Sequence, residues 1–514
     1  MTDPSSASDL MRAKRLKRRH NAERRFKLYG QIAITLAVSF LVMLLVSIGN
    51  KAVGAFSKHS VTLTLAEMDH SADTAPSVTQ INLAVRAALI EALPDAANDR
   101  FDRSEIYRLT TRLAVLPLQR KLAADPALAD GPIEATLALS DDLDLYLKNE
   151  AAAHQTDTIG AAGRFTPTEN GLYRLSDAGP DGFVDLRDQI GRADGLAIDT
   201  LVTFDGAWFD LMEIAGAALI LDHLAGPLPE SGEQNAQVIE KIALDTPEDD
   251  RKVSNRQIAI ALYLKDQGLI TRDFNADLFF NADSTYPELA GAAAALLGSI
   301  FTMLVTALFA LPIGILAAVY LEEFAEKSFL TNVIEVNINN LAAVPSIIFG
   351  LLGAAVFLNT FDLPRSVPLV GGLVLGLLVL PTIIIASRAA LRAVPPSVRD
   401  AALGLGASRS QAVFHHVLPL AAPGILTGAI IAMARALGET APLLLIGMVA
   451  FISEVPNSPN DEATVLPVLI YKWFSGAERA WEPMTAAVIV ILLTVLVAMN
   501  LVATLLRRRF EQRW

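Results

Sequence analysis

Residues 399–442 read RDAALGLGASRSQAVFHHVLPLAAPGILTGAIIAMARALGETAP. The first half is rich in alanine and glycine, although it lies where a loop between two apolar runs is expected. The second half is apolar enough to enter a bilayer, yet it contains Arg435 and Glu439. Charges inside a membrane are costly and mark a pathway or an ion pair. This stretch therefore predicts a membrane transport protein that is driven by something outside its own chain.

The composition of the whole chain agrees with membrane insertion. Hydrophobic residues make up 52% of the 514 residues and the mean hydropathy is +0.41, which is high for a soluble protein. The net charge of −13 is uneven, because residues 51–290 alone sum to roughly −19. A segment this acidic does not bind nucleic acid by neutralising phosphates.

Two absences in the sequence narrow the chemistry. The chain contains no cysteine, which excludes disulfides and thiolate metal sites. It also contains no Gly-Lys pair, which a phosphate-binding loop for nucleotides requires. We therefore expect no cofactor, no metal site, no catalytic residue and no nucleotide hydrolysis by this chain.

The predicted fold is a membrane α-helical protein with a mixed α/β domain inserted after its first span. About 20 apolar residues cross the hydrocarbon core, and six runs are long enough: residues 29–48, 292–320, 334–358, 368–391, 421–451 and 484–506. The predicted domains are a basic cytoplasmic arm (1–28), a first transmembrane anchor (29–50), an acidic extracytoplasmic α/β domain (51–290), a membrane core with five spans (291–509) that includes a cytoplasmic loop (392–420), and a cytoplasmic tail (510–514).

Basic residues set the expected orientation. Nine Lys and Arg lie in residues 11–27, and basic residues beside a span stay in the cytoplasm. Alternating the six spans then places Arg388, Arg399 and Arg507 on that same side. Both termini are therefore expected in the cytoplasm and the acidic domain outside.

Local patterns in the acidic segment predict its mixed character. Residues 59–68 alternate in polarity as a strand does, and residues 79–93 and 133–149 have helical periodicity. The apolar run 214–221 is too short to span a bilayer, so we interpret it as a core helix. Four scattered histidines are interpreted as ordinary surface or core residues: His59, His70, His154 and His223.

The loop at 392–420 is predicted to hold two short helices around a bend. Pro395 and Pro396 favour a helix that begins near Val398. Gly404 and Gly406 permit a sharp turn, because glycine adopts left-handed backbone angles without strain. A second helix over 408–417 is expected to end at the proline at 419. Such a knob can dock in a partner's groove; an ordinary loop is the alternative, but exposed loops rarely carry so few polar side chains unless a partner covers them.

This loop also carries a family resemblance. The pattern D-A-A-x-x-x-G at 400–406, followed after nine residues by H-V-L-P at 416–419, resembles the coupling motif of bacterial ABC-importer permeases. The sequence has Asp400 where that motif has Glu, and His416 where it has Ile. Residues 317–324, 343–352 and 434–443 resemble signatures of one branch, the PstA family of phosphate permease subunits. The resemblance covers about residues 290–509.

The resemblance implies the permease subunit of an ATP-driven importer of inorganic phosphate in the bacterial inner membrane. It implies four partners: an ATP-binding subunit dimer that hydrolyses the ATP, a second homologous permease subunit, an extracytoplasmic phosphate-binding protein and the lipid bilayer. The residues expected to couple to the ATPase are Asp400, Ala401, Ala402, Gly404, Gly406, Leu418 and Pro419.

Four residues are candidates for the substrate pathway. Arg435 and Glu439 are four apart, so they share a helix face and can pair. The planar guanidinium suits phosphate and stays charged, so Arg435 is expected to attract the anion while Glu439 holds and switches it; a purely structural ion pair is equally open. Thr440 and Ser346 add polar groups, and for Ser346 a contact between helices is the favoured interpretation.

Two other functions stay open. The permease can serve another oxyanion, such as sulfate, molybdate or phosphonate. The chain can also be a membrane-anchored sensor that uses its extracytoplasmic domain, although a sensor is expected to carry a cytoplasmic output domain and none follows residue 506. The acidic charge of residues 51–290 does not concentrate an anion. Two roles stay open for this domain: contact with a binding protein, or shielding of the pore mouth.

Overall fold

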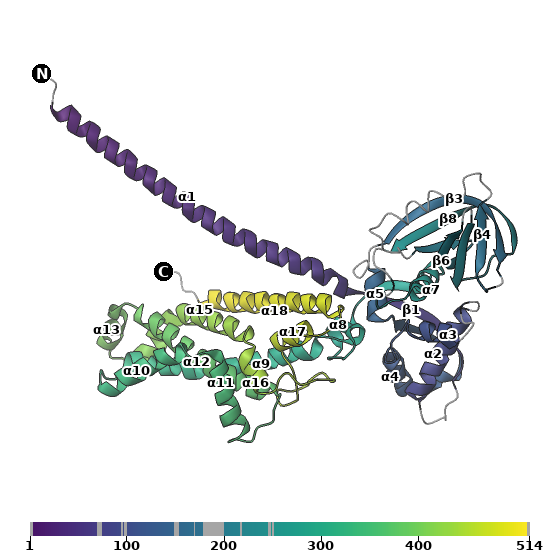
Figure 1. The fold of residues 1–514 in the computed structure, drawn as a ribbon. Helices are drawn as coiled ribbons and strands as arrows, with labels where there is room; N and C mark the ends of the chain where they lie inside the picture. Colours follow the sequence, from purple (N-terminus) through teal and green to yellow (C-terminus); the bar gives the residue numbers. More distant parts are fainter. Residues whose placement is uncertain are drawn as a thin grey trace.

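The computed structural model describes residues 4–68, 75–93, 96, 100–148, 154–168, 170–177, 200–215, 218–244, 248 and 251–510. One long helix leads into a mixed α/β part, which is followed by a layer of helices (Figure 1). The interpretation of His70 lies outside the described residues, and so does that of the His154 side chain.

The first helix, α1 (Pro4–Ala52), extends away from the rest of the chain (Figure 1). Its 49 residues correspond to about 73 Å at 1.5 Å per residue, more than twice the thickness of a hydrocarbon core. Its apolar window has no buried residue, and Lys51 at its end pairs with Glu482. The apolar part of α1 therefore suits a bilayer, and the basic part continues beyond it as the same helix.

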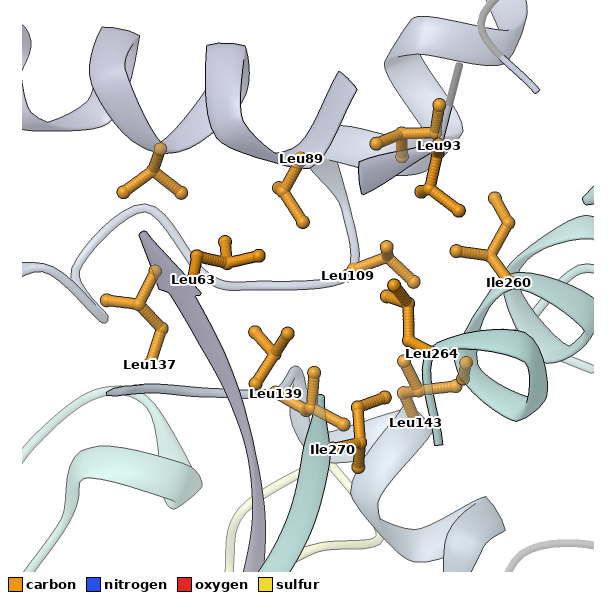
Figure 2. Close-up of a cluster of buried hydrophobic side chains, with 14 of the residues drawn as sticks. Leu63, Leu89, Leu93, Leu109, Leu137, Leu139, Leu143, Ile260, Leu264 and Ile270 are labelled. Carbon is orange, nitrogen blue, oxygen red and sulfur yellow. The ribbon is translucent and has the colours of Figure 1, made fainter. Parts of the chain in front are cut away.

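The α/β part contains a three-stranded antiparallel sheet in the order β2-β1-β9. The strands are β1 (Ser57–Leu65), β2 (Ile133–Ala138) and β9 (Ile270–Phe274). The helices beside it are α2 (Val78–Ala92), α3 (Arg100–Tyr107), α4 (Leu116–Ala124), α5 (Asp141–Leu147) and α7 (Asn255–Asp266). Their apolar side chains meet in one core that contains Leu63, Leu89, Leu137 and Ile260 (Figure 2).

The remaining strands of this part close into a six-stranded barrel, in the order β3-β4-β7-β6-β5-β8. They are β3 (His154–Pro167), β4 (Tyr173–Asp177), β5 (Thr200–Phe204), β6 (Ala207–Ala215), β7 (Ala218–Ala225) and β8 (Gly232–Leu244). Phe165, Phe204 and Phe209 fill the interior, with the rings of Phe204 and Phe209 stacked at 5.0 Å. Trp208 and Ile242 of the barrel belong to the same apolar core as the three-stranded sheet and its helices. The barrel and this sheet-and-helix part therefore share apolar packing.

The predictions for this part are confirmed in some places and wrong in others. The strand at 59–68 and the helix at 79–93 correspond to β1 and α2. The predicted core helix at 214–221 is wrong, because residues 214–215 end β6 and residues 218–221 begin β7, where Leu219 and Leu221 are buried inside the barrel. A short apolar run fits a buried strand as well as a helix. The helix predicted at 133–149 is β2 followed by α5. His59 and His223 are buried.

The helices of the membrane core follow a short linker helix, α8 (Asp277–Phe280). They are α9 (Ala293–Val319), α10 (Phe329–Ala342), α11 (Ser346–Gly353), α12 (Pro368–Arg392), α15 (Leu418–Leu437), α16 (Ala441–Leu445), α17 (Leu466–Phe474) and α18 (Trp481–Phe510). Three π-helical segments occur at Tyr320–Phe324, Ala354–Leu358 and Val413–Val417. Within the described residues, five helices are long and apolar enough to cross a membrane, or six if the bent pair α10–α11 is one span.

The relative direction of α9 and α12 shows that the bent pair α10–α11 crosses the layer of membrane helices. A Cβ on Gly372 would lie 2.5 Å from Val305, and one on Gly376 would lie 2.6 Å from Phe309, so residues four apart on α12 meet residues four apart on α9 in the same order. The two helices are therefore parallel, and the chain between them must return once to the other face. The predicted third span at 334–358 is divided into two helices, since α10 and α11 bend by 104° at Pro345, which disfavours helix at the preceding residue.

The predicted fifth span at 421–451 is wrong in its second half. The helix α15 ends at Leu437, and the chain then turns through the short α16 and through Gly447, whose φ is 96°. The first half of α15 packs antiparallel against α12, since Cβ atoms on Gly424 and Gly428 would lie 2.8 Å and 2.3 Å from the Cβ atoms of Ala390 and Ala386. Small residues here let the two backbones approach closely.

Candidate functional site

Two breaks in the membrane helices lie against each other. The helix α11 begins after Pro345, and α16 begins after the end of α15. A Cβ added to Gly350 would lie 2.7 Å from the Cα of Pro442, so the backbones of α11 and α16 are in close contact. This contact brings Ser346 and Thr440 onto adjoining elements. Broken helices are tolerated in lipid only where other protein or a cavity satisfies their free backbone groups.

Arg435 and Glu439 form a loose ion pair at this break. The Nε of Arg435 lies 3.4 Å from Oε1 of Glu439. Arg435 is in the last turn of α15, where the helix dipole favours a cation, whereas Glu439 follows the end of the helix. The Arg435 side chain is 49% exposed, and its Nη1 and Nη2 have no partner among the described residues. The guanidinium therefore keeps two donor nitrogens that the described part of the chain does not use.

The predicted knob forms two helices around a glycine bend. These are α13 (Pro396–Gly404) and α14 (Arg409–Ala412). Gly406 has a φ of 87°, which explains the glycine there, whereas Gly404 is simply the last residue of α13. Leu405, at the tip, is 90% exposed, which is unusual for a leucine without a covering partner.

The predicted coupling residues are placed unequally on this knob. Asp400, Ala401, Gly404, Gly406 and Pro419 are exposed, Leu418 is half-buried and Ala402 is buried. The predicted helix end at Pro419 is wrong: α14 continues through the π-helical segment into α15. Pro419 lies in the first turn of α15, where a missing N–H costs little.

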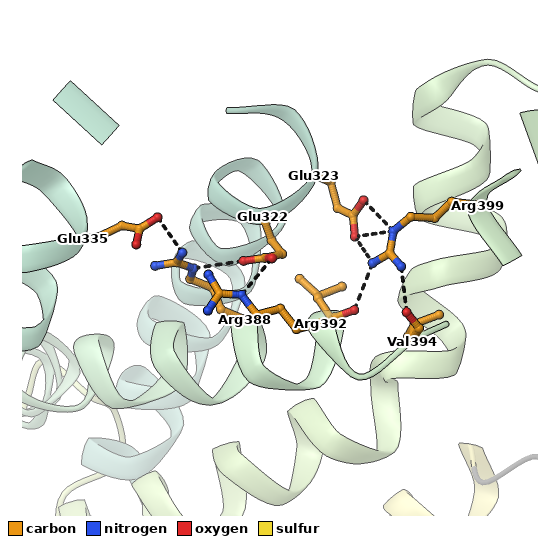
Figure 3. Close-up of polar contacts among 8 residues, drawn as sticks. Glu322, Glu323, Glu335, Arg388, Arg392, Val394 and Arg399 are labelled. Carbon is orange, nitrogen blue, oxygen red and sulfur yellow. Dashed lines mark hydrogen bonds and ion pairs between the residues drawn. The ribbon is translucent and has the colours of Figure 1, made fainter. Parts of the chain in front are cut away.

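Six charged residues that were not predicted as a group form a cluster between the knob and the membrane helices, which we call the charged brace: Glu322, Glu323, Glu335, Arg388, Arg392 and Arg399 (Figure 3). Arg388 lies between two carboxylates, 2.6 Å from Glu335 and 3.4 Å from Glu322. Arg392 lies 2.8 Å from Glu322. Arg399 lies 3.0 Å from Glu323 through its Nε. The sequence does show charged residues at the ends of two apolar runs: Glu322 and Glu323 after one, Arg388 and Arg392 at the end of another. No local pattern indicates that they meet, because the paired positions are more than 50 residues apart.

A second cluster of polar side chains lies at the junction between the α/β part and the membrane core. Asp283 is almost fully buried, pairs with Lys472, and accepts a hydrogen bond of 3.1 Å from Nε1 of Trp473. Nearby, a cavity of about 30 Å³ is lined by Lys58, Asn275 and Glu288, among others. Burial raises the pKa of Glu288 to about 7, although its own backbone N–H and the hydroxyl of Thr111 act in the opposite direction.

Comparisons with known proteins match the two halves of the chain separately. Residues 310–513 match the family described as binding-protein-dependent transport system inner membrane component. Residues 13–157 match a domain of unknown function, DUF3333.

Named relatives match the transport half. The phosphate transport system permease protein PstA 1 of Mycobacterium tuberculosis is 32% identical over 217 residues, which cover 42% of this chain and 70% of the relative. The corresponding PstA of Haemophilus influenzae is 33% identical over 218 residues, or 42% of this chain and 76% of the relative. A solved inward-facing structure of the MetNI methionine ABC transporter aligns with 17% identity and a TM-score of 0.36, over 42% of this chain and 95% of that chain.

The apolar helices and the matched family define the class: a multi-pass membrane permease subunit of an ABC importer. Within that class, the chain belongs to the family of PstA-like permeases. The resemblance noted at residues 317–324, 343–352 and 434–443 is thereby confirmed.

Proposed function

We propose that this chain moves inorganic phosphate into the cell as one permease subunit of an ATP-driven importer. The observation that carries this proposal is the identity of 32–33% to relatives named as phosphate permeases, over at least 70% of their length. ATP hydrolysis is assigned to a separate ATP-binding subunit dimer. A second homologous permease completes the pore, and an extracytoplasmic phosphate-binding protein delivers the substrate.

The break between α15 and α16 is the proposed pathway site. The two unpartnered Nη atoms of Arg435 match the spacing of two phosphate oxygens, and a planar fork binds them bidentately. Glu439 contacts Arg435 only loosely, so an arriving anion can displace it. Thr440 begins the break and Ser346 begins the facing helix α11, where the backbone N–H groups of the first turn favour an anion.

The proposed orientation follows from the distribution of basic residues. The charged brace joins the ends of α9 and α12, and Arg507 near the end of α18 donates to Thr427 of α15 at 3.2 Å. The basic residues of the brace, of the knob and of the carboxyl terminus therefore lie toward one face, which the positive-inside rule assigns to the cytoplasm. We place both termini and loop 392–420 there, and the acidic domain 51–290 outside. The ATP-binding dimer then docks on residues 400–419.

Uptake measurements test this proposal. Cells that carry this chain with the subunits encoded beside it would be given radiolabelled phosphate, with sulfate and molybdate as competitors. Saturable phosphate uptake that Arg435→Ala abolishes and the control Arg365→Ala preserves would support both the substrate and the site. Arg365 is exposed in the loop before α12. Uptake of a competitor instead would replace phosphate by another oxyanion. Absence of any ATP-dependent uptake would favour the sensor alternative.

A further inference from the structure

The charged brace connects the knob to three membrane helices. Figure 3 shows Arg399, on α13, facing Glu323 of the π-helical segment that follows α9. Both Glu323 oxygens accept from Arg399, at 3.0 Å and 3.1 Å from Nε. The Glu323 side chain is only 7% exposed. This pair is therefore an enclosed, charge-assisted contact, which holds its geometry better than a surface pair does.

Arg399 also holds the end of α12. Its Nη1 donates to the carbonyl of Val394 at 2.8 Å, and its Nη2 donates to the carbonyl of Leu391 at 2.9 Å. These carbonyls belong to the last turn of α12 and the residues after it, where backbone acceptors lack helical partners. One guanidinium thus joins three elements: α9 through Glu323, α12 through two carbonyls, and α13 through its own backbone.

Arg388 extends the connection to the bent span. It lies on α12 and contacts Glu322, beside Glu323, and Glu335 on α10. None of the residues of α10 is buried in this chain, so the ion pair is a specific attachment of that helix to α12. A movement of α13 that reaches Arg399 can therefore pass to α9, α12 and α10 together.

The knob itself has few other attachments. Within α13, Ala402 is the buried residue, and the exposed tip at Leu405 leaves the bend free for a partner. Val398 packs against the small apolar cluster of Val394, Val413 and Val417. Apolar contacts allow sliding, whereas a guanidinium that bonds to four oxygens fixes both position and orientation.

We propose that Arg399 and Glu323 form the joint that transmits movement of the docked knob to the membrane helices, with Arg388 carrying it on to α10. This inference rests on the proposed docking of an ATP-binding subunit at residues 400–419. Both are positioning residues, since neither is placed in the substrate pathway. A buried ion pair is a poor source of stability compared with apolar packing, which agrees with a role in fixing geometry.

The test compares uptake with ATP consumption in the complete importer. The full chain, its ATP-binding subunit, its second permease and its binding protein would be reconstituted in proteoliposomes. Radiolabelled phosphate taken up per ATP hydrolysed would be measured for wild type, Glu323→Gln and Arg399→Gln. Glu326→Gln is the matched control, because Glu326 lies three residues after Glu323, just beyond the π-helical segment, and is exposed. We expect uptake per ATP to fall roughly tenfold in the two joint variants, within the range typical of coupling between sites, while the ATP-binding subunit still co-purifies and hydrolyses ATP.

A cross-link provides the rescue. The chain has no cysteine, so the double variant Glu323→Cys and Arg399→Cys introduces the only two thiols of this chain, which a bis-methanethiosulfonate reagent can join. The joined protein should recover uptake per ATP that the unjoined double variant lacks. If the two residues were merely structural, uptake and ATP hydrolysis would fall together with the amount of folded complex, and uptake per ATP would stay unchanged.

The outcomes separate the joint from the proposed function. Normal uptake per ATP in both joint variants, or failure of the cross-link to restore it, would overturn the joint alone. A wild-type complex that does not retain the ATP-binding subunit would overturn the docking and the joint together. If the wild-type importer carries sulfate rather than phosphate, sulfate uptake per ATP tests the joint in the same way. Only the proposed substrate would then be replaced.

Discussion

Gly350 of α11 lies so close to Pro442 of α16 that a Cβ on the glycine would be 2.7 Å from the proline Cα and 3.0 Å from its carbonyl oxygen. Backbone atoms cannot give way as the end of a flexible side chain can. Gly350→Val should therefore separate the two broken helices and cost about 1–3 kcal/mol through overpacking. Thermal unfolding of the purified chain and phosphate uptake both measure this. Gly49→Ala is the control, because nothing lies within 4 Å of its added Cβ; equal stability of the two variants would contradict the close contact.

The two Nη donors of the Arg435 guanidinium can be tested separately from its positive charge. Arg435→Lys keeps a cation at the end of α15 but loses the two Nη donors that have no partner among the described residues. Losing a hydrogen bond to a charged group costs about 1.5–3 kcal/mol, so we expect the apparent affinity for phosphate to fall roughly 10- to 100-fold. Concentration-dependent uptake measures this directly. Unchanged affinity in the lysine variant would leave Arg435 and Glu439 as a structural ion pair.

Glu288 predicts a pH-dependent stability for the junction. Burial, with smaller contributions from Asp141 and Glu478, raises its pKa from 4.5 to about 7. The folded protein therefore binds this proton more tightly than the unfolded chain does. The associated stability is fully present below about pH 4.5 and is lost as the pH rises through about 7, by at most about 3 kcal/mol.

Thermal unfolding of the purified chain between about pH 4.5 and 7.5 checks this sign. Glu288→Gln should flatten that part of the profile, because the amide does not titrate. A profile that is the same for wild type and variant would show that Glu288 does not contribute to it.

The buried pair of Asp283 and Lys472 predicts a large effect from a small change. Asp283→Asn keeps the shape of the side chain but removes the charge opposite Lys472, so a partly buried ammonium loses its carboxylate and keeps only the ring of Phe451 at 4.8 Å. Breaking such a pair costs about 3–5 kcal/mol, which unfolding in denaturant or heat would detect. Asp362→Asn is the matched control: Asp362 is exposed with a φ of 52°, a conformation that asparagine also adopts readily.

Much of the fold was predictable because its signals are local. The length of an apolar run depends on bilayer thickness, so the sequence predicts six crossings. The helix α2 was also predictable from the helical periodicity of residues 79–93, and the structure adds a capping box of Ser77 and Gln80 at its start. The knob with its bend at Gly406 and the contact between Arg435 and Glu439 follow from spacing alone. The roles of these residues in docking and transport stay predictions.

What only the tertiary structure decided involves residues far apart in the chain. Residues 214–215 and 218–221 belong to strands because Leu219 and Leu221 find partners in a barrel, which no local period reveals. The bend of the third span was decided by Pro345 together with the close packing of α11 on α16. The charged brace exists because parallel packing of α9 and α12 brings their ends together, more than 60 residues apart for Glu322 and Arg388. Sequence periodicity specifies which face of an element is apolar, whereas the identity of the element that covers it depends on the whole chain.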